Sequence, residues 1–201
     1  LEQAIHDFFY ARDFVRCDTP ILTGAQGESG GLFETEYFEE GKAYLAQTGQ
    51  LYGEALAAAL GRIYTFGPTF RAEKSKTRRH LTEFWMIEPE MAWYDLDDSL
   101  RLQEELVSYL VERALERRGE ELKLLERDTS RLELVRPPFV RLDYGDAVAL
   151  VQRKGSDTQW GEDLGAPDEA RIVEEHDRPV FVTNYPKEAK AFYMKENPAD
   201  P

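Results

Sequence analysis

The chain has 201 residues, of which 42% are hydrophobic and 32% are charged, so it can bury a sizeable core and does not have the composition of a disordered chain. Its formal net charge of −14 opposes general attraction to nucleic acid, because such binding depends on Lys and Arg, so we expect no DNA partner and only local RNA contacts. One cysteine, Cys17, excludes an internal disulfide, and no apolar run could span a bilayer, which together favour a cytoplasmic protein with no membrane association.

The first part of the chain predicts a helix, a strand and a loop. Apolar residues fall near helical spacing between Ala4 and Ala11, and residues 13–15 then lead to Pro20, which forces the preceding residue toward an extended geometry. Residues 24–31 contain four glycines and little apolar content. This composition predicts a mobile loop of the kind that often closes over ligands.

The next part predicts a helix and a pair of strands. Thr48 can cap a helix that runs to Gly61, where glycine suits a left-handed C-terminal stop. Two runs rich in β-forming residues follow at 62–73 and 83–93, separated by the basic residues 74–79. We therefore expect an antiparallel pair of strands joined by a long basic loop.

A long helix and a connection come next. Asp97 and Asp98 precede a strong amphipathic pattern that ends near Gly119. Residues 120–138 are charged and end in two prolines, which predicts a connecting segment.

The last part predicts short strands alternating with helices. We expect a strand at 139–142, a helix from Gly145 to Val151, and an acidic helix near 167–173. Residues 179–183 have the pattern of a buried strand, with residues 191–194 as its hairpin partner. The whole order is typical of an α+β fold, an antiparallel β-sheet flanked by helices.

The most informative chemistry lies on the predicted strand pair. In a strand, Arg71 and Glu73 point to the same face, which places a phosphate-binding cation beside an acceptor for an amino group. Phe84 on the returning strand could lie under a purine ring, while His80 could meet its phosphates. Taken singly, each residue is better explained as a surface ion pair, a solvated hairpin residue or a core aromatic.

The combination resembles a known motif. Residues 66–90 contain F-R-A-E, a basic loop and R-H-L-T-E-F, and so resemble motif 2 of the class II aminoacyl-tRNA synthetases. The resemblance implies ATP as a substrate, accompanied by Mg²⁺, with no metal site formed by protein side chains. It places Arg71 on the α-phosphate as the catalytic cation, Glu73 on the adenine amino group, Phe84 against the adenine ring and His80 near the phosphates.

Upstream, residues 13–20 resemble motif 1, the helix and strand that build the dimer interface of this family. Pro20 would then lie at a homodimer interface. The usual glycine before the aromatic residue is Asp13 here, a residue type that tolerates a left-handed backbone better than most.

The amino-acid substrate is indicated by three positions. Residues 46–52 resemble the substrate-binding segment shared by aspartyl- and asparaginyl-tRNA synthetases, in which Gln50 would contact the amino acid. Gly53 stands where aspartyl enzymes typically carry a lysine for the substrate carboxylate, and Glu88 stands where they carry aspartate. A carboxylate at Glu88 could accept a hydrogen bond from an asparagine amide. The resemblance therefore implies asparagine, ATP and tRNA(Asn) as partners.

Two further parts of the chain carry weaker expectations. By the resemblance, Glu28 in the glycine-rich loop would match the family carboxylate for the substrate ammonium, and a solvated loop residue is the alternative explanation. Residues 184–194, with Tyr185 and Lys187, look more asparaginyl than aspartyl, but packing explains these two side chains equally well.

The resemblance makes the chain a partial catalytic domain. Motif 1 would occupy about residues 4–20, motif 2 about 62–93, a helical and connecting region about 96–178, and further sheet strands about 179–194. The anticodon-binding β-barrel of the family would precede Leu1, and motif 3, with its phosphate-binding arginine, would follow Pro201. We therefore expect the 201 residues alone to show little or no activation activity.

Three alternatives stay open. A paralogue could activate aspartate with ATP and make free asparagine from ammonia, and an aspartyl-tRNA synthetase would also contain motif 2. A non-catalytic relative could keep the fold as a dimerisation or RNA-binding module. The presence of Arg71, Glu73 and Phe84 argues against the third, because a module without catalysis has no need of a phosphate cation beside an adenine acceptor.

Overall fold

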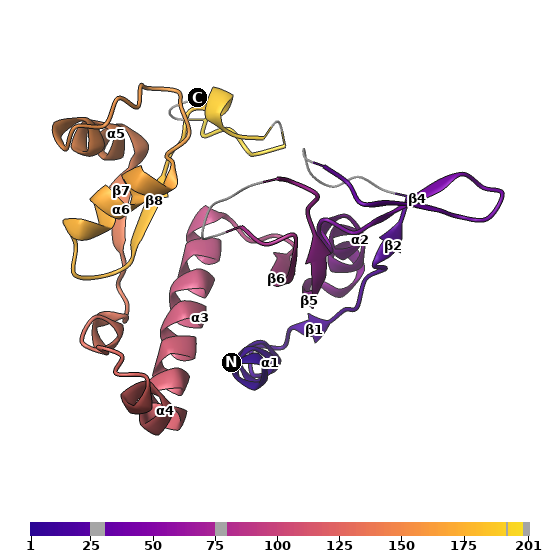
Figure 1. The fold of residues 1–201 in the computed structure, drawn as a ribbon, viewed down its shortest axis with the longest axis horizontal. Coiled ribbons are helices and arrows are strands. Elements are labelled where there is room, and N and C mark those ends of the chain that lie inside the picture. The colour runs from indigo at the N-terminus through magenta and orange to yellow at the C-terminus, as the bar shows by residue number, and fades with distance from the viewer. Residues whose placement is uncertain (25–30, 75–79, 192, 199–201) are drawn as a thin grey trace. The chain divides into compact units, whose positions relative to one another are not determined.

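The structure is a computed structural model that describes residues 1–24, 31–74, 80–191 and 193–198 (Figure 1). It divides into two compact units, one formed by residues 2–95 and the other by residues 96–201 together with Leu1. The motif 1 and motif 2 segments both belong to the first unit, which therefore carries the candidate site.

A three-stranded sheet forms the centre of the first unit. Strand β5 (Arg62–Phe70) lies between β1 (Val15–Arg16), with which it is parallel, and β6 (Glu83–Met91), with which it is antiparallel. The expected antiparallel pair is confirmed, whereas the parallel pairing of β1 was not predicted. The ladder continues past the end of β5, because the Arg71 N–H donates to the Thr82 carbonyl at 3.0 Å.

Two helices pack on opposite faces of this sheet. Helix α1 (Glu2–Tyr10) buries Phe9, whose ring stacks on Tyr64 at 4.5 Å between centroids. Helix α2 (Gln50–Leu60) packs Ala57 with Ile63, the residue next to Tyr64 on β5. Successive side chains of a strand point to opposite faces, so α1 and α2 cover different sides of the sheet.

The C-terminal end of α2 follows the sequence prediction, whereas the N-cap residue is Gly49 and not the expected Thr48. Gly61 ends the helix with φ of +83°, and its N–H donates to the Ala57 carbonyl at 2.8 Å. A positive φ is readily adopted by glycine, which explains the residue type. At the other end, the Thr48 hydroxyl accepts a hydrogen bond from the Gln50 N–H at 3.0 Å.

A second sheet of the first unit consists of β2 (Leu22–Thr23), β4 (Lys42–Leu45) and β3 (Glu34–Glu36), antiparallel and in the order β2-β4-β3. The segment after β4 joins it to the central sheet, because Phe70 N–H donates to the Ala46 carbonyl at 2.9 Å. This link holds the residues just before α2 beside the end of β5.

The second unit begins with a long helix and ends in a small α/β arrangement. Its elements are α3 (Leu96–Arg117), α4 (Gly119–Leu124), the 3₁₀ turn η1 (Leu132–Leu134), β7 (Val140–Asp143), α5 (Tyr144–Arg153), α6 (Ala166–Glu174), β8 (Val180–Thr183) and the 3₁₀ turn η2 (Lys187–Ala189). Tyr144, Ala147 and Val151 are fully buried in its core. No helix in the described part of the chain is long and apolar enough to cross a membrane.

One strand pairing differs from the sequence prediction. Strand β8 pairs in parallel with β7, not in a hairpin with residues 191–194, and residue 192 lies outside the described residues. Parallel strands need a crossover connection, which α5 and α6 supply here. The expectation was wrong because it considered only the nearest downstream segment as a partner.

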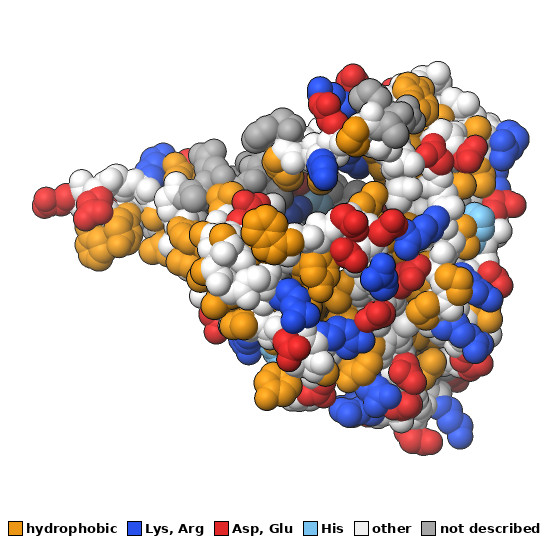
Figure 2. Space-filling view, turned by 180° about the vertical axis from the view of Figure 1, so that it is seen from behind, with side chains coloured by type: hydrophobic (Ala, Val, Ile, Leu, Met, Phe, Trp, Pro, Cys, Tyr) orange, Lys and Arg blue, Asp and Glu red, His pale blue; other side chains and the backbone are white. Residues whose placement is uncertain are grey.

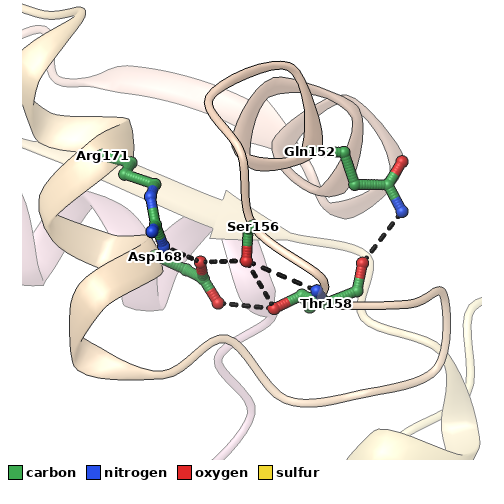
Figure 3. A network of polar contacts seen from close by, with 5 residues as sticks. All are labelled: Gln152, Ser156, Thr158, Asp168 and Arg171. Atoms are coloured by element: carbon green, nitrogen blue, oxygen red, sulfur yellow. Dashed lines mark hydrogen bonds and ion pairs between the residues drawn. The ribbon is translucent and has the colours of Figure 1, made fainter.

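The α5–α6 connection is held by a buried carboxylate (Figure 3). Asp168 accepts hydrogen bonds from Ser156 at 2.6 Å, from Thr158 at 2.7 Å and from Arg171 at 2.8 Å. These donors, the Ser156 bond first, hold the pKa of Asp168 below its usual value. The hydrogen bonds from Ser156 and Thr158 tie the segment after α5 to α6, and Asp168 therefore stabilises the second unit.

Candidate nucleotide and amino-acid site

The end of β5 and the start of β6 bring a cation and an aromatic ring together. The guanidinium carbon of Arg71 lies 5.6 Å from the centre of the Phe84 ring. Thr69 pairs with Phe84 across the strands, and Arg71 is two residues beyond Thr69, so all three side chains share one face. Arginine above an aromatic face is a surface on which a purine nucleotide can stack and a phosphate can pair.

Glu73 and His80 lie beyond this pair, on the two sides of the hairpin connection. His80 Nε2 is 3.3 Å from the Glu73 carboxylate, within ion-pair distance but without hydrogen-bond geometry. Their segment contacts the last residue of the glycine-rich loop, because the Ala72 N–H donates to the Gly31 carbonyl at 2.9 Å. A Cβ at Gly31 would lie 2.6 Å from the Ala72 carbonyl oxygen, so this approach requires glycine.

Arg71 carries an unmet hydrogen-bonding capacity. Among the described residues, its buried Nε has no hydrogen-bond partner. A buried donor without a partner is costly, and the cost is recovered when an anion binds. The arrangement is therefore suited to a phosphate group, which supplies charge-assisted acceptors.

Glu88 lies four residues beyond Phe84 on β6 and points to the same face, where it pairs with Thr65. Its carboxylate accepts hydrogen bonds from the Thr65 hydroxyl at 3.1 Å, from the Gly49 N–H at 2.9 Å and from the Thr48 hydroxyl. The predicted acceptor is thus present, and protein donors already hold it. Thr48 and Thr65 were missed by the sequence analysis, because only the strand register shows that they reach Glu88.

The first turn of α2 carries the other two predicted amino-acid contacts, directly after Gly49, which bonds Glu88. The Gln50 side-chain amide donates to Glu54 at 2.9 Å, along the helix. Gly53 is buried, and a Cβ there would lie 3.4 Å from Cγ of Glu90. The missing side chain at position 53 therefore leaves room for Glu90.

Glu90 is a further residue that the sequence analysis missed. Burial first, and then the nearby carboxylates of Glu54 and Glu88, raise the pKa of Glu90 to about 7. The spacing of Glu88 and Glu90 could have revealed it, since residues two apart on a strand share a face.

A cavity of about 170 Å³ opens at the edge of β5, where β1 ends. Glu88 and Thr65 line one side of it, and the exposed Pro20 lines another together with Trp85. Glu88 and its three donors Thr48, Gly49 and Thr65 form what we call the Glu88 cluster. The structure thus places Pro20 close to the Glu88 cluster, on a surface accessible in the single chain.

Three further positions from the sequence analysis lie outside the described part of the first unit. Glu28 lies outside the residues that the structure describes. Tyr185 and Lys187 belong to the second unit, where Tyr185 packs on Tyr144 at 4.8 Å between ring centroids and Lys187 pairs with Glu196. Their contacts in that unit are those of packing residues.

Known proteins resemble the amino-acid sequence of this chain from its first residue to its last. The family model described as tRNA synthetases class II (D, K and N) matches residues 1–201. The chain is 58% identical over 202 residues to an asparagine–tRNA ligase of Pelotomaculum thermopropionicum, covering 100% of this chain and 47% of that protein. It is 57% identical over 205 residues to an asparagine–tRNA ligase of Chloroflexus aurantiacus, covering 98% and 47%.

Solved structures of synthetases are also similar to this chain. Asparaginyl-tRNA synthetase from Pyrococcus horikoshii, complexed with asparaginyl-adenylate, superimposes with a TM-score of 0.94 at 46% identity, covering 100% of this chain and 46% of that chain. A putative aspartyl-tRNA synthetase from Leishmania major gives a TM-score of 0.79 at 26% identity, covering 98% and 46%. The chain spans about half the length of the proteins it matches. From its sequence and its fold, the chain belongs to the class II tRNA synthetases of the D, K and N group.

Proposed function

We propose that this chain forms part of the catalytic domain of an asparagine–tRNA ligase, which makes asparaginyl-adenylate from asparagine and ATP and transfers the amino acid to tRNA(Asn). The observation that carries the proposal is the single β5–β6 face that presents Arg71 over Phe84 at one end and the Glu88 cluster at the other. The similarity to a synthetase complexed with asparaginyl-adenylate supports the same assignment.

In the first step, a carboxylate oxygen of asparagine attacks the α-phosphorus of ATP, and the bond to the β-phosphate oxygen breaks to release pyrophosphate. Arg71 pairs with the α-phosphate and stabilises the charge that develops there. Phe84 positions the adenine, and Glu73 accepts a hydrogen bond from the adenine amino group. His80, which lies beside Glu73, is assigned to the phosphates. In the second step a ribose hydroxyl of the tRNA attacks the adenylate carbonyl carbon, and AMP leaves.

Magnesium enters this scheme with the nucleotide. Among the described residues, no group of three or more His, Cys, Asp or Glu side chains could hold a metal ion. Mg²⁺ commonly keeps several waters and bridges substrate phosphates, so ATP itself can supply its ligands.

Selection of asparagine over aspartate is assigned to Glu88 and Gly53. Glu88 offers an acceptor for the substrate amide, and Gly53 supplies no cation for a substrate carboxylate. Gln50 begins the same helix and is proposed to contact the bound amino acid, and Glu28 to pair with its ammonium group.

The remaining partners follow from the family. We assign Pro20 to a homodimer interface, and we place the enzyme in the cytoplasm. Figure 2 shows acidic and basic side chains interspersed over the visible face, so tRNA contact is assigned to local basic groups rather than to a broad basic surface.

The test uses a full-length protein that contains this chain. It should catalyse asparagine-dependent ATP–pyrophosphate exchange and charge tRNA(Asn), whereas the 201 residues alone should do neither at a substantial rate. Incubation with ATP, aspartate and ammonia should yield no free asparagine. Free asparagine in that reaction, or exchange that depends on aspartate alone, would replace the proposal by the asparagine-forming paralogue or by an aspartyl enzyme.

A further inference from the structure

The hydrogen bonds around Glu88 have a fixed direction. A hydroxyl has one hydrogen to donate. Thr48 accepts from the Gln50 N–H at 3.0 Å and donates its own hydrogen to Oε1 of Glu88. Thr65 donates to Oε2 of the same carboxylate at 3.1 Å, and the Gly49 N–H donates to Oε2 at 2.9 Å.

Among the residues that the structure describes, these bonds leave one acceptor position of Glu88 unused. A carboxylate has about four lone-pair sites, two on each oxygen. Gly49 and Thr65 fill the two sites of Oε2, and Thr48 fills one site of Oε1. The second site of Oε1 can receive an N–H group and repels another carboxylate, so it discriminates an amide from an acid.

The packing shows that this cluster is closely built. A Cβ at Gly49 would lie 2.8 Å from the Thr65 hydroxyl oxygen, 2.9 Å from that of Thr19 and 3.2 Å from Oε2 of Glu88. Only glycine allows the backbone before α2 to approach the carboxylate this closely. The contacts therefore fix Glu88 from two elements, its strand partner β5 and the start of α2.

We propose that Thr65 and Thr48 are positioning residues for amino-acid selection, which hold Glu88 so that its single unused lone pair on Oε1 is presented to the substrate amide. This inference rests on the proposed function, because it assigns the amide of asparagine to that lone pair. Neither threonine needs to touch the substrate. Each acts through the direction in which it fixes the Glu88 carboxylate.

The test is Thr65→Val in the full-length protein, since valine keeps the shape of threonine and removes the donor. We expect the KM for asparagine to rise by roughly 10- to 100-fold, the scale of one lost hydrogen bond to a charged group. The KM for ATP should stay within about threefold, and aspartate should compete better with asparagine. Thr65→Ser, which restores the hydroxyl, should recover most of the asparagine affinity. Thr48→Val removes a donor to Glu88 together with the acceptor of the Gln50 N–H, so it should raise the KM for asparagine at least as much as Thr65→Val.

The matched control is Thr35→Val, on the exposed strand β3, which should leave both KM values unchanged. If Thr65→Val raises the KM for asparagine and for ATP alike, or if both hydroxyl deletions leave asparagine selectivity intact, the threonines have only a structural role and the inference is overturned. If the unsubstituted protein does not use asparagine at all, the proposed function fails first, and the two failures are thereby distinguished.

Discussion

Replacing Gly53 with lysine tests how the pocket reads the charge of the substrate side chain. Gly53 lies in α2, and a Cβ there would meet Cγ of Glu90 at 3.4 Å and Cδ1 of Ile63 at 3.5 Å, which is ordinary contact. Lysine is also a better helix former than glycine, by about 0.5–1 kcal/mol. The substitution should therefore fold, and its effect should be electrostatic.

The magnitude depends on Glu90. An ammonium about 4 Å from a substrate carboxylate gains roughly 4 kcal/mol at an effective dielectric constant of about 20, which sets an upper limit near a thousandfold. However, burial and the Glu54 and Glu88 carboxylates raise the pKa of Glu90 to about 7, and a new ammonium would favour the ionised Glu90 and pair with it. We expect Gly53→Lys to lower asparagine use by roughly 10- to 100-fold while aspartate use stays poor.

The double variant separates the two effects. In Gly53→Lys with Glu90→Gln, the ammonium has lost the carboxylate nearest to position 53, so aspartate-dependent ATP–pyrophosphate exchange should rise at least about tenfold over the single variant. Gly53→Ala is the control, because it adds the Cβ without the charge. If Gly53→Lys and Gly53→Ala show the same asparagine-to-aspartate ratio of kcat/KM, position 53 does not read the substrate side chain.

Three further predictions address the other groups. Arg71→Ala should slow adenylate formation by roughly two to three decades in pre-steady-state assays, and a loss below tenfold would remove Arg71 from its assigned role. Asp168→Ala should destabilise the second unit by about 2–4 kcal/mol in denaturant unfolding, because it leaves the buried Ser156 and Thr158 hydroxyls without their acceptor. Since the pKa of Asp168 is lowered by folding, its contribution should be present above about pH 4 and disappear as the pH falls below that. The pH dependence contributed by Glu90 has the opposite sign. Because folding raises its pKa, the protein should lose stability relative to Glu90→Gln as the pH rises from about 5 to 7, which thermal unfolding at a series of pH values would show.

Much of the first unit could be predicted because its signals are local. The helical spacing of residues in α1, the stop at Gly61 and the two β-rich runs are all periodic or turn patterns within single elements. The placement of Arg71 and Phe84 on one face was also predictable, from alternation along each strand together with the family resemblance.

The rest depends on contacts between distant segments. The pairing of β8 with β7 joins residues about 40 positions apart through two helices, and no pattern in either strand specifies that partner. The same holds for Thr65 and Thr48, which reach Glu88 only because β5 and β6 pair in one register and the chain before α2 returns to the sheet. The raised pKa of Glu90 likewise depends on burial by the folded chain and then on Glu54, which comes from a helix and not from the strand.

The register of β5 and β6 links both halves of the site. Phe84 pairs with Thr69 and Glu88 with Thr65, so the two ends are four residues, or about 13 Å, apart along the same face. A ligand that joins an adenine at Phe84 to an amide at Glu88 must cross the pair between them, which is Gly67 with Met86. A Cβ at Gly67 would meet no atom of the described residues within 4 Å, so the strand surface is open at this point. A shift of the pairing by one residue would turn Phe84 and Glu88 away together, so the proposed nucleotide-binding and amino-acid-selecting residues both depend on this register.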